Sequence, residues 1–197
     1  SMITADFKKS NFSGEEIITL NNIGKSYGSK KLFSEVSLKV HRNDRIAVVG
    51  SNGCGKTTLI KILTGEVAPD EGGIITGKSI KAQYMPQVID FDDNEATVLD
   101  ILRHALEIGE ERARAILAAF HFKGRDVFKK AGALSGGEKS RLKLCLLMQC
   151  ETNFLILDEP TNHLDIVSRE WIEESLEQYK DTLVFISHDR YFLNRFA

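Results

Sequence analysis

The sequence predicts an α/β fold: a mostly parallel sheet with an N-terminal antiparallel β subdomain and an inserted helical lobe. Three short apolar runs lead to this expectation, namely Ile46–Val49, Phe154–Leu157 and Leu183–Ile186. None of them alternates apolar with polar residues, which is typical of strands buried on both faces of a parallel sheet. A segment with helical spacing follows each run, and this alternation indicates the α/β class. The helices are expected at Lys56–Leu63, at Ser168–Tyr179 and from Arg190 onward.

The segment ahead of the first buried run has a different pattern. Residues 1–16 are polar and mixed, so we expect a linker or an arm that lies over the domain. Ile17–Leu20 and Val36–Val40 alternate apolar with polar residues, which predicts half-buried antiparallel strands. Turns are expected at Gly24 and Gly28.

A helical lobe is expected between about residues 88 and 150. VLDILRHALE, EERARAILAAF and GGEKSRLKLCLLMQ all have helical spacing and almost no strand pattern. The main domain is therefore expected to cover residues 17–197, with the lobe inserted in it. The chain opens on Ser1-Met2 and stops inside an expected helix, so we expect a piece of a longer protein that is truncated at its C-terminus.

The composition excludes several classes of protein. The 197 residues are 42% hydrophobic, and 26 Lys and Arg against 28 Asp and Glu give a net charge of −2. These values are typical of a globular protein and argue against a disordered chain or a domain coated in positive charge for nucleic acid. No apolar run approaches the roughly 18 residues that span a bilayer, so no membrane insertion is expected. Three cysteines without CxxC spacing favour reduced thiols and a cytoplasmic location over disulfides or a zinc site.

One loop predicts phosphate binding. Its sequence, GSNGCGKT, matches the pattern G-x-x-x-x-G-K-[ST] between a buried strand and a helix. Glycines let successive N–H groups point at phosphate oxygens, and the helix dipole favours the anion. Lys56 is expected to reach the β- and γ-phosphates, and the Thr57 hydroxyl to bind Mg²⁺. The expected nucleotide-binding residues are Gly50, Ser51, Asn52, Gly53, Cys54, Gly55, Lys56, Thr57 and Thr58.

Acidic residues follow the second buried run. Asp158 at the strand end can hold Mg²⁺, and Glu159 can act as the general base on the attacking water. His188 follows the third buried run and is expected at the same edge of the sheet, where it can contact a γ-phosphate. The weaker alternative for the pair is an ordinary junction between a strand and a turn, and for His188 a surface histidine.

A second glycine-rich element, Ser135–Glu138, opens an expected helix. Ser135 and Glu138 have the spacing of a capping box, so a purely structural role is one interpretation. The other is a second anion site made by Ser135 and the N–H groups of Gly136 and Gly137. A cap does not need two glycines, which mildly favours the anion site.

These motifs together resemble the nucleotide-binding domain of ABC-type ATPases. The matching elements are GSNGCGKTT, Gln87 in QYMPQ, LSGGE, FLILDEP, a loop ending at Asp165, and His188. They follow the order of the family from about Tyr27 to Asp189. The resemblance implies ATP and Mg²⁺ as cofactors and a P-loop NTPase core.

Two stretches resemble the ABC-F class within this family, DEPTNHLDI and LSGGEKSRLKL. The resemblance implies the C-terminal ATPase domain of a bacterial protein with two such domains on one chain. ABC-F proteins act on the ribosome and its tRNA, as translation factors or in antibiotic resistance. The alternatives are the ATPase subunit of an ABC membrane transporter and a nucleotide-dependent binding module with little turnover.

The resemblance also implies roles for single residues. Tyr27 would stack on adenine, and a buried strand tyrosine is the alternative. Gln87, with Gln83 as a weaker candidate, would sense Mg²⁺ and the attacking water. Ser135, Gly136, Gly137 and Glu138 would face the γ-phosphate bound to the second ABC domain, and Asp165 would couple the two sites. The expected catalytic residues are thus Glu159, His188 and Gln87, and the expected metal-site residues are Thr57, Gln87 and Asp158.

Overall fold

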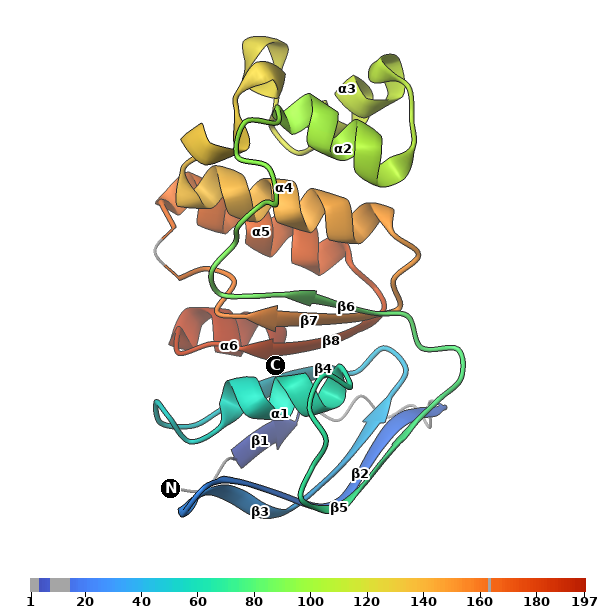
Figure 1. Cartoon of the computed structure of the whole chain (residues 1–197), viewed down its shortest axis with the longest axis vertical. Coiled ribbons are helices and arrows are strands. Elements are labelled where there is room, and N and C mark those ends of the chain that lie inside the picture. Colours follow the sequence, from blue (N-terminus) through green and yellow to red (C-terminus); the bar gives the residue numbers. More distant parts are fainter. Residues whose placement is uncertain (1–3, 8–14, 163) are drawn as a thin grey trace.

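The computed structural model describes residues 4–7, 15–162 and 164–197. It confirms the α/β fold with a parallel core sheet, an N-terminal antiparallel sheet and an inserted group of helices (Figure 1). The antiparallel sheet lies at one end of the molecule in this view, and the inserted helices α2 and α3 lie at the other.

The core sheet has the strand order β1-β4-β8-β7-β6. Its strands are β1 (Thr4–Phe7), β4 (Arg45–Val49), β8 (Thr182–Ile186), β7 (Phe154–Asp158) and β6 (Ala82–Met85). The three apolar runs form the three central strands, which pair in parallel, and β6 continues the parallel set at one edge. At the other edge β1 pairs with β4 in antiparallel register. Four residues of the segment expected to be a linker or arm therefore form an edge strand.

The second sheet is antiparallel with the order β3-β2-β5. Its strands are β2 (Glu16–Tyr27), β3 (Lys30–His41) and β5 (Glu71–Thr76). The turn expected at Gly28 is confirmed, and this residue has a left-handed φ of +57°. The turn expected at Gly24 is wrong, because β2 continues through this residue with irregular register on both sides. A Cβ at Gly24 would lie 2.8 Å from Oε2 of Glu71 on β5, but this atom is the end of a flexible exposed side chain, so the contact does not require glycine.

Six α-helices are described: α1 (Lys56–Leu63), α2 (Val98–Leu106), α3 (Glu110–Ala119), α4 (Gly136–Gln149), α5 (Ile166–Gln178) and α6 (Arg190–Phe196). Two 3₁₀ segments, Gly124–Phe128 and Ala131–Ala133, precede α4. Between residues 88 and 150 the described chain forms helices and one isolated bridge but no strand, as the sequence predicts. Among the described helices, none is long and apolar enough to cross a membrane.

Two apolar clusters cover the two faces of the core sheet. Leu155 and Leu157 pack into the cluster formed with α2 to α6, whereas Phe154 and Ile156 pack into the cluster formed with α1 and the antiparallel sheet. Successive side chains of a strand point to opposite faces, so Asp158 follows Ile156 onto the α1 face. This alternation places the carboxylate beside the start of α1.

Candidate nucleotide-binding site

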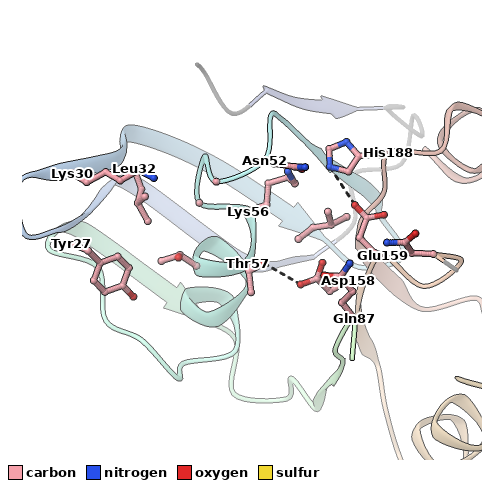
Figure 2. Close-up of a pocket in the computed structure, with 15 residues that line it drawn as sticks. Tyr27, Lys30, Leu32, Asn52, Lys56, Thr57, Gln87, Asp158, Glu159 and His188 are labelled. Carbon is pink, nitrogen blue, oxygen red and sulfur yellow. Dashed lines mark hydrogen bonds and ion pairs between the residues drawn. The ribbon is translucent and has the colours of Figure 1, made fainter. Parts of the chain in front are cut away.

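A cavity of about 560 Å³ lies where the carboxyl ends of β4, β7 and β8 meet the start of α1 (Figure 2). It is lined by Tyr27, Lys30, Leu32, Asn52, Gly53, Gly55, Lys56, Thr57, Thr58, Gln87, Asp158, Glu159, Asn162, Ile186 and His188. Figure 2 shows Tyr27, Lys30 and Leu32 at one end of the cavity, and Gln87, Asp158, Glu159 and His188 at the other. Such a position is where ligands bind in parallel α/β sheets.

The cavity brings together most of the residues expected to bind nucleotide and metal. Gly50, Ser51 and Cys54 belong to the same loop without lining the cavity, and Gln83 also lies outside it. The sequence interpretation missed four lining residues: Lys30, Leu32, Asn162 and Ile186. Lys30 and Leu32 share one face of β3, but only the packing of the antiparallel sheet on the core brings that face to the loop.

The start of α1 has the features of an anion-binding helix N-terminus. The helix begins at Lys56 after Gly55, whose φ of 103° is left-handed. A Cβ at Gly55 would lie 2.9 Å from Cδ1 of Phe33, so this position admits only glycine. Gly55 offers no capping side chain, and the first turn of α1 contains no acidic residue. The free N–H groups and the positive end of the helix dipole therefore favour a phosphate.

Lys56 is a cation held over the loop. Its side chain is folded back so that Nζ donates to the carbonyl oxygens of Gly50 at 2.8 Å and Ser51 at 3.0 Å. The residue is only 8% exposed, and within the described chain it forms no ion pair. Burying an ammonium group beside neutral acceptors is costly, so an anionic ligand fits this site.

Asp158 is a buried carboxylate beside the start of α1. Its Oδ2 accepts hydrogen bonds from Thr57 Oγ1 at 3.2 Å and from Tyr84 OH at 3.3 Å (Figure 2 shows the first). Burial raises the pKa of the Asp158 carboxyl, and these two hydrogen bonds and the charge of Lys56 oppose the rise. A hydroxyl and a carboxylate beside a phosphate pocket are the oxygen ligands that Mg²⁺ uses, so the donor set fits this ion.

Glu159 has a backbone conformation that is uncommon outside glycine. Its φ is +51°, and its N–H donates to the carbonyl oxygen of Ile186 at 2.9 Å. This bond fixes the start of the loop after β7 against the end of β8. Burial raises the pKa of the Glu159 carboxyl, and the nearby His188 opposes the rise. A raised carboxyl pKa in a cavity suits a general base.

Tyr27 at the end of β2 and Cys54 in the loop have distinct surroundings. Tyr27 is 54% exposed at the cavity edge, which excludes the alternative of a buried strand tyrosine. Nζ of Lys25 lies over its ring, 5.6 Å from the centroid. Cys54 is buried, and its Sγ would lie 2.8 Å from a Cβ at Gly50. This contact explains why the first residue of the loop is glycine.

Residues 33–162 match the family model described as ABC transporter. The chain belongs to the ABC transporter family. It is an ABC-type nucleotide-binding ATPase domain, which agrees with the cavity at the start of α1.

Relatives of this ABC domain include a translational throttle protein and a member of the ABC transporter F family. It is 38% identical over 93% of its length to "Energy-dependent translational throttle protein EttA" of Escherichia coli (strain K12), covering 34% of that protein. It is 36% identical over 96% of its length to "ABC transporter F family member 2" of Arabidopsis thaliana, covering 28%. The chain thus spans about a third of the curated relatives it matches.

A solved structure shows the same fold. A bacterial Atm1-family ABC exporter with ATP bound superposes with a TM-score of 0.75 at 20% identity. The match covers 92% of this chain and 36% of the exporter chain. At this identity the likeness supports the ABC fold alone.

The LSGGE segment of the ABC domain lies outside the cavity. Ser135 caps α4: its Oγ accepts from the Glu138 N–H at 3.2 Å, while Glu138 Oε2 accepts from the Ser135 N–H at 2.9 Å. A Cβ at Gly137 would lie 2.3 Å from Oγ of Ser168, so this glycine has a packing role. A Cβ at Gly136 would meet nothing within 4 Å, so no contact within the described structure requires glycine there.

Asp165 also lies outside the cavity and begins α5. Its Oδ1 accepts from the Ser168 N–H at 2.9 Å, and its Oδ2 accepts from Ser168 Oγ at 2.8 Å. These bonds lower the pKa of the Asp165 carboxyl. The residue expected to couple two ATP sites is therefore also the N-cap of a helix, held next to Gly137.

Proposed function

We propose that this ABC domain binds ATP with Mg²⁺ in the cavity and hydrolyses the β–γ phosphate bond. The supporting observation is a convergence at the carboxyl ends of the core strands: a buried ammonium group bonded only to carbonyl oxygens among the described residues, a helix N-terminus without a side-chain cap, and two carboxylates. Mg²⁺, when bound, neutralises phosphate charge in this class of reaction.

Each residue of the cavity has a proposed role that follows from its chemistry. Lys56 and the N–H groups at the start of α1 bind the phosphates, and Tyr27 stacks on adenine. Thr57 and Asp158 hold the metal directly or through water, with Gln87 beside them. Glu159 accepts a proton from the attacking water, and His188 contacts the γ-phosphate.

The nucleotide assignment is tested by titration with a fluorescent ATP analogue. Lys56→Ala removes the buried cation, so its Kd is expected to rise at least about 10-fold, which is the loss of one charge-assisted hydrogen bond. Lys61→Ala removes an exposed lysine from the last turn of the same helix and serves as the matched control. An unchanged Kd for Lys56→Ala would contradict the assignment.

We further infer that the domain is one of two ABC domains in a cytoplasmic ABC-F protein that acts on the ribosome. The identity to EttA, whose name describes a translational throttle, supports this placement. A role in translation or in antibiotic resistance, with contacts to tRNA, belongs to the full-length protein.

The second ABC domain would complete each ATP site. Ser135, Gly136, Gly137 and Glu138 would face the γ-phosphate bound to that domain, and Asp165 would link the two sites. The open space at Gly136 supports this arrangement. No contact within the described structure requires glycine there, whereas close approach of a phosphate bound to the second domain would require it.

The ribosome assignment is tested with the full-length protein carrying Glu159→Gln and the equivalent change in its other ABC domain. Cells are fractionated on a sucrose gradient in ATP, which is expected to hold the two domains closed. Migration with ribosomes supports the ABC-F assignment. Recovery in the membrane pellet without ribosomes would instead favour a transporter ATPase.

A further inference from the structure

Tyr84 approaches the metal-site carboxylate from outside the cavity. Strands β6 and β7 are parallel, and their register pairs Tyr84 with Ile156. Asp158 lies two residues beyond Ile156 and therefore on the same face of β7. The length of the tyrosine ring spans this offset, and its hydroxyl donates to Oδ2 of Asp158 at 3.3 Å.

Two hydroxyl groups converge on the same carboxylate oxygen. Thr57 Oγ1 and Tyr84 OH both donate to Oδ2 of Asp158, from α1 and from β6 respectively. The terminal torsion of an aspartate is broad and is poorly fixed by its own rotamer preference. Two donors from different elements restrict this torsion, so Oδ1 keeps one direction.

We propose that Tyr84 is a positioning residue of the metal site, whose hydroxyl fixes the Asp158 carboxylate for Mg²⁺ and ties it to the strand that leads into Gln87. The proposal rests on the function proposed above and deepens it. Groups that orient a metal ligand also contribute to metal binding, and their loss typically weakens it about 10- to 100-fold.

The Tyr84 side chain is half-buried on the α1 face of the sheet. The ring packs against the apolar cluster on the α1 face. Strand β6 ends at Met85, and Gln87 lines the cavity just beyond it. The hydrogen bond therefore joins the element that carries Gln87 to the carboxylate expected to hold the metal.

The test uses Tyr84→Phe, which removes only the hydroxyl group. Oδ2 of Asp158 keeps the bond from Thr57, so the variant does not leave this oxygen without a donor. Tyr179→Phe is the matched control: Tyr179 is another partly buried tyrosine, and its hydroxyl donates to the Thr152 carbonyl oxygen at 3.4 Å. Tyr84→Leu, which loses the same hydroxyl, provides a second variant should the phenylalanine ring pack poorly.

The measured quantity is binding of a fluorescent ATP analogue, first in EDTA and then as Mg²⁺ is added. Tyr84→Phe and Tyr84→Leu are expected to raise the Mg²⁺ midpoint about 10-fold, while the Kd in EDTA stays as in the unmodified protein. Tyr179→Phe is expected to change neither value. A purely structural role of Tyr84 would change the Kd in EDTA as well.

Three results would overturn the proposal. An unchanged Mg²⁺ midpoint in both Tyr84 variants removes the positioning role and leaves the proposed function intact. Equal weakening with and without Mg²⁺ assigns Tyr84 to the general shape of the cavity. Absence of any Mg²⁺-dependent binding by the unmodified protein contradicts the proposed function itself, and the positioning role with it.

Discussion

The Nε2 atom of His188 lies 3.4 Å from Oε1 of Glu159 across the carboxyl ends of two neighbouring strands. Glu159 is mostly buried, with a side chain 13% exposed, whereas that of His188 is 49% exposed. The imidazole is therefore the more solvent-exposed member of the pair, whose contact is drawn in Figure 2. Glu159, the expected general base, and His188, the expected contact to the γ-phosphate, thus lie at the same end of the cavity.

Glu159→Gln is expected to preserve ATP binding and to block turnover. The amide keeps the size of the side chain but cannot accept the proton of the attacking water. General-base catalysis contributes about 10²- to 10⁴-fold, and a loss in this range is expected in phosphate release by the intact protein. Glu174→Gln, an exposed change on α5, is the control. Undiminished hydrolysis in Glu159→Gln would exclude Glu159 as the base.

The pH profile of turnover provides a second test of the same residue. Burial raises the pKa of Glu159 above its ordinary value of 4.5, against the opposing effect of His188. The base acts only as the carboxylate, so activity should fall on acidification at a pH above that of an ordinary glutamate. The measurement is kcat/KM between about pH 3.5 and 8 at saturating Mg²⁺, because kcat/KM reports the groups of the ligand-free enzyme. An acid limb at or below 4.5 would contradict the raised pKa.

Lys30 and Lys31 offer a matched pair for a phosphate contact. Lys30 lines the cavity, and its Nζ would lie 3.9 Å from a Cβ at Gly53, whereas the neighbouring position on β3 points to the other face. Lys30→Met is expected to weaken binding of ATP and ADP analogues about 3-fold, with a smaller effect at high salt because the residue is exposed.

Lys31→Met controls for the loss of one positive charge on the same strand. Adenosine, which has no phosphate, should bind equally to both variants and to the unmodified protein. Equal weakening by the two substitutions would assign the effect to net charge rather than to a contact made by Lys30.

The central strands were predictable because each is a short apolar run buried on both faces. Strands at the sheet edges gave a weaker pattern: β6 carries Gln83 among four residues, and β5 opens with two glycines after Glu71. The strand at Gly24 has no local pattern, because this residue pairs with Glu71 on a strand far away in the sequence.

In the site as well, local motifs were predictable, whereas contacts between distant strands were not. The phosphate loop and the pair Asp158–Glu159 are each a short continuous motif at the end of a buried apolar run. Because such runs form parallel strands, the sequence is enough to predict that the two motifs lie close together. Tyr84 and Lys30 become functional candidates only through the register of β6 with β7 and the packing of β3 on the loop. No local pattern of residues encodes either relationship.

Substitutions at Ser135 separate its two roles. Ser135→Ala removes the side-chain cap of α4 and should lower the free energy of unfolding by about 1 kcal/mol. Ser135→Arg loses the same cap and adds a long charged side chain at the start of α4. Both variants of this ABC domain should bind the ATP analogue like the unmodified domain, because Ser135 lies outside the cavity.

The two variants should differ in the intact protein. If Ser135 faces ATP held by the second ABC domain, Ser135→Arg should abolish nucleotide-dependent closure and turnover, while Ser135→Ala keeps a large part of both. Turnover is measured by phosphate release, and stability by thermal melting of each variant. Equal turnover at equal stability would leave Ser135 as a helix cap only. Unfolding by Ser135→Arg alone would show that the packing around α4, rather than a contact with a second domain, limits this position.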